Sequence, residues 1–510
     1  MKLKASSVSI DSSGVSRMDA SFPRLFNTVT VVLMLAGPPR RFGLLLFGKT
    51  LIPNQRILLK RTNNLPILPI DTGRYGTNEM RRVFEEETRI QKMLDVEAAL
   101  ALAHAEVGNI PFEDAEKIAA MASLKHVKVA RVKVIEKEIK HDLASLVRSL
   151  SEVCGPSGAY VHLGVTSYDI VDTANALQLK DALGLIEEKL MALKCTLQEQ
   201  AEQYKDTVMM GRTHGQHALP ITLGFKFAVW GREVARHLQR LNECRRRVIV
   251  GKVSGAVGTQ AGLGRHAPRI QDFVMKKLGI QAAEISTQIV QRDRYAELVS
   301  LLAIVASSLE NFATEIRELQ RPEIGEMFES FEIEKQVGSS TMPHKQNPET
   351  CERICGLARI ARSLAVPSLE NMVTWHERDL TQSSAERFIL PESCIIVDYL
   401  LALMNHVMVN LRVDTQRMLT NIGLTQGRSM SEAVMMALTK TGVNRQEAHE
   451  LLRKLTIKSA LEKRPFKEVL LEDKFVCEKL SEKDIGRALE PRNYLGTAAK
   501  QAESFARDER

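Results

Sequence analysis

The chain has 510 residues, which excludes a peptide hormone, a single small module and a disulfide-stapled miniprotein. Hydrophobic residues make up 44% and charged residues 26% of it, which excludes wholesale disorder. The first 66 residues hold ten Lys or Arg against two acidic residues, whereas the remaining chain holds 60 of each sign. The formal charge of +8 therefore resides in this N-terminal segment and does not indicate a nucleic-acid partner for the body.

Residues 1–66 form a basic N-terminal extension that contains no Glu. Its longest apolar run, over 29–36, is much shorter than the roughly 20 residues that span a bilayer. An Arg-rich, acid-poor leader is compatible with an organellar transit peptide or with a secretory signal. We instead expect a start codon that is placed too far upstream, with the protein proper beginning near Leu65.

One motif in the extension has the pattern of a phosphate-binding loop. Residues 43–50, GLLLFGKT, satisfy GxxxxGK[ST], but that loop must follow a buried strand and open a helix. Here PPRR precedes the motif, and Pro53 interrupts any helix that follows it. We therefore expect no nucleotide hydrolysis at this position.

Beyond the extension, apolar residues recur with helical spacing. Two stripes advance in steps of three and four residues, namely Leu179, Leu183, Ile186, Leu190, Leu193 and Leu197, and then Leu298, Leu302, Val305, Leu309, Phe312 and Ile316. Each stripe predicts one long amphipathic helix. A further helix is predicted over 220–249, starting at Pro220. Another is predicted around the apolar stretch 394–411, which follows Pro391, a residue suited to the first turn of that helix.

These helices must bury their apolar faces against one another, which predicts a mainly α fold built around a long central bundle. We expect three helical domains after the extension 1–66. They are an N-terminal domain over 67–167, a central bundle domain over 168–418 and a C-terminal domain over 419–510.

Breaks rich in Gly, Ser and Thr interrupt the predicted helices at 154–167, 211–215, 251–264 and 337–347. A rigid scaffold positions such loops, so catalytic residues are expected there. The densest polar cluster is GSSTMPHKQNP over 338–348. Its serines, Lys345 and Asn347 supply donors that can bind a carboxylate and stabilise a carbanion beside it. A polar loop that opens a helix at Pro348 explains the Ser and Pro residues but not the Lys-x-Asn pair.

Three further polar clusters carry histidine, which suits general acid–base chemistry because imidazole titrates near neutrality. They are KHD over 140–142, YVHLGVTS over 160–167 and GRTHGQH over 211–217. His214 and His217 have no third ligand at a recognised spacing, and Cys351 and Cys355 are two thiols alone, so we expect no metal. Seven cysteines without a CxxC pair indicate a reducing, cytoplasmic compartment.

Together these motifs resemble those of the fumarase/aspartase superfamily of lyases, whose signature is GSSxxPxKxNP. Within it, the chain is similar to the adenylosuccinate lyase family from about Leu68 to the C-terminus. The similar segments are RYGTNEM (74–80), KHD (140–142), HLGVTSYDIVDTA (162–174), GRTHGQHA (211–218), STQIVQRDR (286–294), the loop 338–348 and WHERDLTQSSAER (375–387). The resemblance implies the three-domain fumarase/aspartase-like fold, whose bundle forms the core of a tetramer.

The resemblance also implies the activity of a carbon–nitrogen lyase of purine nucleotide biosynthesis. Such an enzyme eliminates fumarate from adenylosuccinate to give AMP, and from the succinylated aminoimidazole carboxamide ribotide (SAICAR) to give AICAR. It implies no cofactor, and small nucleotides as ligands rather than nucleic acid or a membrane. The family builds each site from three chains of a homotetramer, so residues 141, 214 and 339 are expected to meet only between subunits.

Residue roles follow by matching motifs. His214, beside Thr213, matches the general acid that protonates the departing amine, and Ser339 matches the base that removes the β-proton. The matches to residues that orient and polarise the substrate are His141 and His162. The matches to residues that hold the succinyl carboxylates are Thr166, Ser167, Gln288, Ser340, Lys345 and Asn347. The matches to the nucleotide-holding set are Arg74, Tyr75, Arg378, Ser384 and Arg387, and the KHD motif adds Lys140 and Asp142 to the binding residues.

One departure and two alternatives accompany this interpretation. Lys140 stands where many family members have Arg, which keeps the charge but loses the bidentate fork. Argininosuccinate lyase, aspartase or fumarase would share the signature loop, but their substrates carry no phosphate for Arg74, Arg378 and Arg387. A non-catalytic helical protein would have no use for an intact Ser339.

Overall fold

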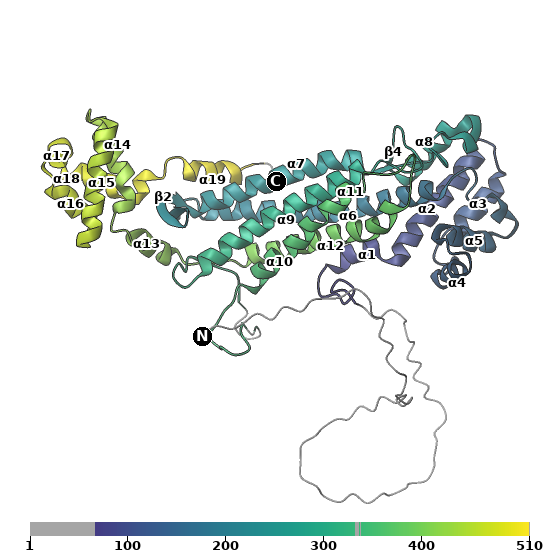
Figure 1. The fold of residues 1–510 in the computed structure, drawn as a ribbon, viewed down its shortest axis with the longest axis horizontal. Coiled ribbons are helices and arrows are strands. Elements are labelled where there is room, and N and C mark those ends of the chain that lie inside the picture. Colours follow the sequence, from purple (N-terminus) through teal and green to yellow (C-terminus); the bar gives the residue numbers. More distant parts are fainter. Residues whose placement is uncertain (1–66, 332–335, 337, 509–510) are drawn as a thin grey trace, which may run out of the picture. The chain divides into compact units, whose positions relative to one another are not determined.

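Long helices dominate the structure (Figure 1), as the apolar stripes predict. This computed structural model describes residues 67–331, 336 and 338–508, so the N-terminal extension and its GLLLFGKT motif lie outside the described residues. The predicted mainly α fold is confirmed. In the described part, strand structure is limited to three two-stranded sheets.

Four long helices form the central bundle: α6 (Ser167–Gln203), α7 (Leu223–Val248), α9 (Asp293–Gln320) and α12 (Thr381–Val409). They pack side by side (Figure 1), with α6 against α7 and α12, and α9 against the same two helices. Every residue of the two predicted stripes is at most 2% exposed, so the stripes are the shared core. Burying each such side chain stabilises the fold by roughly 1.5–3 kcal/mol.

The helix predicted from Pro220 starts three residues later than expected. Pro220 lies in strand β2 (Gln216–Thr222), which forms an antiparallel hairpin with β1 (Val208–Thr213). Helix α7 begins at Leu223 because the Thr222 hydroxyl accepts a hydrogen bond from the Phe225 N–H at 3.1 Å and caps its first turn.

The prediction that Pro391 occupies the first turn of a helix is wrong. Pro391 lies well inside α12, which begins at Thr381. A proline within a helix removes one backbone hydrogen bond. The preceding residues Ile389 and Leu390 are buried in the bundle core, and this packing offsets the lost bond.

Smaller helices precede the bundle and surround the start of α6. They are α1 (Asn78–Phe84), α2 (Glu86–Glu106), α3 (Phe112–Met121), α4 (Val129–Ile139), α5 (Asp142–Cys154) and the 3-10 helix η1 (Gly155–Tyr160). A second hydrophobic core joins α2, α3 and α5 to the first turns of α6, to η2 (Ala261–His266) and to α8 (Ala267–Leu278). This core holds the polar start of α6 in place.

Further elements lie between the bundle helices or directly after α12. They are β3 (Val250–Gly251), β4 (Gln281–Ala282), β5 (Met327–Phe328), α10 (Glu349–Ser363), α11 (Ala365–Glu370), β6 (Arg412–Val413) and α13 (Thr415–Gly423). Strands β3 and β4 pair in parallel, and β5 pairs with β6 in antiparallel fashion.

The last helices of the described chain are η3 (Arg428–Met430), α14 (Ser431–Lys440), α15 (Arg445–Glu462), α16 (Phe466–Glu472), α17 (Lys474–Lys479), α18 (Glu482–Leu489), η4 (Pro491–Tyr494) and α19 (Ala498–Ala506). Of these, α14 to α18 form a third hydrophobic core of their own. Helix α19 returns to the bundle and packs on α6 and α7. Its Phe505 lies over Gly231, where a Cβ atom would come within 1.9 Å of the ring.

Two described helices, α9 and α12, are long and apolar enough to cross a membrane by length and composition alone. Of their most apolar windows, 67% and 61% are buried inside the fold. Their apolar surface therefore serves the packing of the bundle.

Candidate active site

A cavity of about 640 Å³ lies at the start of α6, and we call it the α6 cavity. Six of the residues matched to the family's site line it: Lys140, His141, Asp142, Ser167, Arg378 and Arg387. They come from the junction of α4 and α5, the start of α6, the segment before α12 and the first turns of α12. The fold thus brings together residues as distant in sequence as Asp142 and Arg387, which are 245 positions apart.

Asp142 and Arg387 form an ion pair in the wall of the cavity. Arg387 Nη2 donates to Asp142 Oδ2 at 2.5 Å. Burial alone would raise the pKa of Asp142, but the Arg387 guanidinium and the Leu143 N–H bind the carboxylate and lower it. Asp142 therefore stays ionised and holds Arg387 beside the cavity.

His141 is the N-cap of α5, and its side chain lines the cavity. Its Nδ1 accepts a hydrogen bond from the Ala144 N–H at 3.3 Å. The neutral ring therefore carries its proton on Nε2, which is free to donate. Lys140, one residue earlier, ends α4 with a left-handed φ of 57°, a strained conformation of the kind that gathers at functional sites.

Arg378, which lines the cavity, contacts both Tyr168 and Gln288. Its guanidinium carbon lies 3.6 Å from the centroid of the Tyr168 ring, and Nη1 donates to Gln288 Oε1 at 2.8 Å. Its Nε is buried and has no partner among the described residues. The guanidinium of Arg378 thus lies in the cavity wall, stacked on Tyr168 and with Gln288 held next to it.

Tyr168 is a cavity residue that the sequence analysis missed. It stacks on Arg378, and its hydroxyl donates to Ser383 Oγ at 2.7 Å. Burial is the main cause that raises the pKa of Tyr168. Tyr168 directly follows Ser167 in the HLGVTSYDIVDTA motif, and this position could have identified it as a residue of the site.

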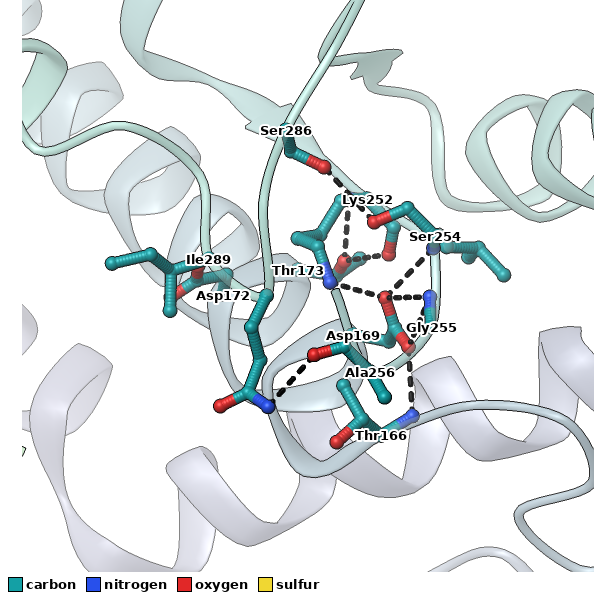
Figure 2. Close-up of polar contacts among 12 residues, drawn as sticks. Thr166, Asp169, Asp172, Thr173, Lys252, Ser254, Gly255, Ala256, Ser286 and Ile289 are labelled. Carbon is teal, nitrogen blue, oxygen red and sulfur yellow. Dashed lines mark hydrogen bonds and ion pairs between the residues drawn. The ribbon is translucent and has the colours of Figure 1, made fainter. Parts of the chain in front are cut away.

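A buried carboxylate, Asp169, ties the start of α6 to the loop after β3 (Figure 2). It accepts hydrogen bonds from the Thr166 N–H at 2.8 Å and from the Ser254 N–H at 2.8 Å, and it pairs with Lys252. Both members of the ion pair are fully buried. The Thr166 backbone is thus held by the Asp169 carboxylate, whose negative charge is neutralised by Lys252.

The same loop also holds Gln288. Gln288 Nε2 donates to the Ala256 carbonyl at 2.8 Å, and the Ser254 and Ser286 hydroxyls lie 2.9 Å apart (Figure 2). Through these contacts the backbone that carries Thr166 and the side chain of Gln288 are positioned by one polar network, although neither lines the α6 cavity.

His162 lies just before α6 with a left-handed φ of 66°. Its Nδ1 is 2.6 Å from Oε1 of Glu97, a residue of α2 that is 1% exposed. Burial alone would lower the pKa of His162, but the Glu97 carboxylate and, more weakly, Asp169 raise it above its usual range. No sequence motif marks Glu97, which lies among the buried, mainly apolar residues of α2.

Thr213 and His214 lie exposed at the tip of the β1–β2 hairpin, and His214 has a left-handed φ of 54°. Arg212 anchors the hairpin through a bidentate ion pair with the buried carboxylate of Glu326, at 2.7 and 2.9 Å. The hairpin follows the end of α6, and the 37 residues of this helix extend over about 55 Å. His214 is therefore remote from the α6 cavity.

The loop 338–348, called the signature loop below, lies beyond the C-terminal end of α9. Gln320, the last residue of α9, donates to the Gln346 carbonyl at 3.1 Å. Inside the loop, Ser339 Oγ accepts from the Met342 N–H at 3.0 Å, and Asn347 Nδ2 donates to the Gly338 carbonyl at 2.8 Å. Ser340 and Lys345 are exposed.

The remaining matched residues lie elsewhere. Arg74 is exposed, and Tyr75 packs on Tyr399 of α12 with ring centroids 6.0 Å apart. Ser384 is exposed in the first turn of α12, one residue after the cavity-lining Ser383.

The chain thus presents its matched residues in separate groups: the α6 cavity with its neighbours, the hairpin tip and the signature loop. Within the described residues, no hydrogen bond or ion pair joins the tip 213–217 to the loop 338–348. Thr213 and His214 of the tip and Ser340 and Lys345 of the loop are exposed.

Comparison with known proteins agrees with this geometry. Residues 73–362 match the family model described as "Lyase", and residues 427–505 match "Adenylosuccinate lyase C-terminus". Among solved structures, the fold is similar to a fumarate lyase from Mesorhizobium sp. BNC1, with a TM-score of 0.79 and 33% identity over 85% of this chain and 98% of that one. It is also similar to the 3-carboxy-cis,cis-muconate lactonizing enzyme of Pseudomonas putida, with a TM-score of 0.78 and 35% identity over 86% and 98% of the two chains.

Curated relatives are more similar still. The chain is 51% identical to adenylosuccinate lyase of Pyrococcus abyssi, over 86% of this chain and 97% of that protein. It is 47% identical to adenylosuccinate lyase of Methanocaldococcus jannaschii, over 86% and 96% of the two chains. The chain belongs to the adenylosuccinate lyase family.

Proposed function

We propose that this protein eliminates fumarate from adenylosuccinate to give AMP, and from SAICAR to give AICAR. The observation that carries this proposal is 51% identity over 97% of an adenylosuccinate lyase, together with a match to that family's own C-terminal model. The signature loop is shared across the superfamily, whereas the arginines of the α6 cavity suit a phosphate-bearing substrate.

Ser339 is the proposed base. The proton that it removes lies on the carbon next to a carboxylate of the succinyl group, so negative charge develops on that carboxylate as an aci-carboxylate. Serine is a weak base at its free pKa and must be activated. The Met342 and Thr341 N–H groups, 3.0 and 3.4 Å from Ser339 Oγ, support this role because they stabilise the deprotonated oxygen.

His214 is the proposed acid. When the β-proton moves to Ser339, the electron pair of the C–H bond forms the C=C bond of fumarate and the C–N bond breaks. The departing nitrogen takes its proton from His214, which leaves the exocyclic amino group of AMP or the carboxamide group of AICAR neutral. Lys345, Asn347 and Ser340 would bind the carboxylate on which charge accumulates, since all three carry donors on the signature loop.

The α6 cavity is the proposed nucleotide and succinyl subsite. Arg378 lines the cavity with its positive charge, and the Nε2 of His141 is not used by the contact with the Ala144 N–H, so both side chains suit an anionic ligand. Thr166, Ser167 and Gln288 would hold a succinyl carboxylate at the start of α6, where the helix dipole favours an anion. Arg74, Tyr75, Ser384, Arg387, Lys140 and Asp142 complete the proposed nucleotide-binding set.

We propose a homotetramer whose sites are shared between subunits. The separation of the hairpin tip from the α6 cavity by the length of α6 supports this, because one chain cannot bring His214 and His141 to one substrate. We also propose domain boundaries near 167 and 418. The third core, within α14 to α18, supports the second boundary, and the gathering of α2, α3 and α5 in the second core, which also takes in the first turns of α6, supports the first. A cytoplasmic location is proposed from seven cysteines, all of them free.

An absorbance assay tests the function. Purified protein should turn over adenylosuccinate and SAICAR, and the Ser339→Ala variant should lose this activity. Absence of a spectral change with adenylosuccinate, alongside turnover of argininosuccinate, would identify a different lyase of the superfamily. Absence of turnover with every substrate of the superfamily would indicate a non-catalytic protein.

Removal of residues 1–64 should leave kcat, KM and the oligomeric state unchanged. Every residue assigned above lies beyond position 73, and the family model begins at residue 73. Activity and size-exclusion chromatography of the shortened and full-length chains provide the comparison. Loss of folding in the shortened chain would show that the extension packs on the body.

A further inference from the structure

Glu97 is a buried carboxylate with a single described partner. It lies on α2 among the residues of the second hydrophobic core and is 1% exposed. Its Oε1 is 2.6 Å from His162 Nδ1, and its Oε2 has no hydrogen-bond partner among the described residues. A buried carboxylate with one contact is costly unless that contact carries the opposite charge. The position of Glu97 therefore favours a cationic His162.

The contact with Glu97 also determines which ring nitrogen of His162 is available to a ligand. Because Nδ1 is engaged by Glu97, only Nε2 remains to meet a ligand, and the His162 side chain is 20% exposed. Four residues later the chain enters α6, where Thr166 and Ser167 lie at the positive end of the helix dipole. An imidazolium at this place adds a full positive charge to the proposed carboxylate subsite.

The charged groups around His162 support this charge state. On α2, His104 Nε2 donates to the Leu163 carbonyl, 3.0 Å away, and burial lowers the pKa of His104, so it is neutral at pH 7. On α6, Asp169 adds a negative field, part of which Lys252 neutralises. Glu97 is thus the dominant charge on His162.

We propose that Glu97 is a positioning residue that keeps His162 protonated, with Nε2–H directed at a carboxylate of the succinyl substrate. This inference rests on the proposed function and adds to it a residue from α2 that touches no substrate. Glu97 acts through charge as well as through orientation, because a neutral His162 would present a lone pair to an anion and repel it.

The Glu97→Gln variant separates these two contributions. Glutamine keeps the size of glutamate and an oxygen that accepts from Nδ1–H, but it lacks the charge. At pH 8 we expect KM for adenylosuccinate, and the inhibition constant of fumarate, to rise about 10- to 100-fold, the worth of one charge-assisted hydrogen bond. We expect kcat to change by less than about threefold. As the pH is lowered, the variant's KM should fall toward that of the wild type, because His162 then becomes protonated without Glu97.

Asp181→Asn is the matched control. Asp181 lies on α6 and pairs with Lys92 of α2 at 2.7 Å, so its replacement removes another carboxylate from the contact of the same two helices. Its KM should follow the wild-type pH profile. If Glu97→Gln keeps the wild-type KM at pH 8, or if its KM is raised equally at all pH values and does not fall toward the wild-type value as the pH is lowered, the inference is wrong.

A second variant keeps the test decisive should Glu97→Gln fail to fold. His162→Gln should have a raised KM without the pH dependence that the wild type shows above neutrality; an unchanged KM, or the same pH dependence in both proteins, overturns the proposal. Failure of the proposed function is distinguishable, because the wild-type protein itself would then not turn over adenylosuccinate.

Discussion

Replacement of His214 by alanine should lower kcat by about 10²- to 10⁴-fold, the usual worth of a general acid. The departing nitrogen otherwise leaves as an anion, which raises the barrier to C–N cleavage. Assembly and melting temperature should stay unchanged, because His214 is exposed at the hairpin tip and the ion pair of Arg212 with Glu326 anchors the hairpin. Stopped-flow or steady-state absorbance with adenylosuccinate measures the effect, and size-exclusion chromatography monitors assembly.

Two variants control for the strained backbone of the tip. Asparagine tolerates the left-handed φ of 54° better than alanine but donates no acidic proton, so His214→Asn should be as inactive as His214→Ala. Gln216→Ala removes an exposed side chain from the same turn and should keep nearly full activity. A wild-type rate in either His214 variant would assign the acid to another residue.

Mixing two inactive variants, His141→Ala and His214→Ala, should restore activity once their subunits are exchanged. In one chain these residues lie near opposite ends of α6, whose 37 residues extend over about 55 Å. A shared site therefore takes His141 from one subunit and His214 from another. In a mixed oligomer some sites receive both intact residues, so activity should appear from two preparations that have none.

A matched mixture gives the negative control. His141 and Arg378 line the same cavity of one chain, so mixing His141→Ala with Arg378→Ala leaves no intact cavity and should restore nothing. Activity is measured after mild dissociation and reassembly, with each variant treated alone as reference. Failure of His141→Ala and His214→Ala to complement, in confirmed mixed oligomers, would contradict the shared site.

Helix prediction succeeded where periodicity and burial coincide. The two apolar stripes form the buried faces of α6 and α9. It failed at Pro220 and Pro391, because local preference there is weaker than the pairing of β2 with β1 and the packing of α12. Proline is a boundary signal only when no tertiary contact outweighs its missing hydrogen bond.

The sequence by itself determined the family and the chemistry of the candidate residues, because the motifs depend on residue type and spacing. It also determined the mainly α fold, because the period of the apolar residues is a property of the chain. Only the tertiary structure decided which of these residues meet. It placed Arg378, Tyr168 and Asp142 in one cavity and left His214 and Ser339 outside that cavity. It also paired Glu97 with His162, which are 65 positions apart in the sequence. Such contacts join segments distant in sequence, and they depend on how helices pack, which no local pattern encodes.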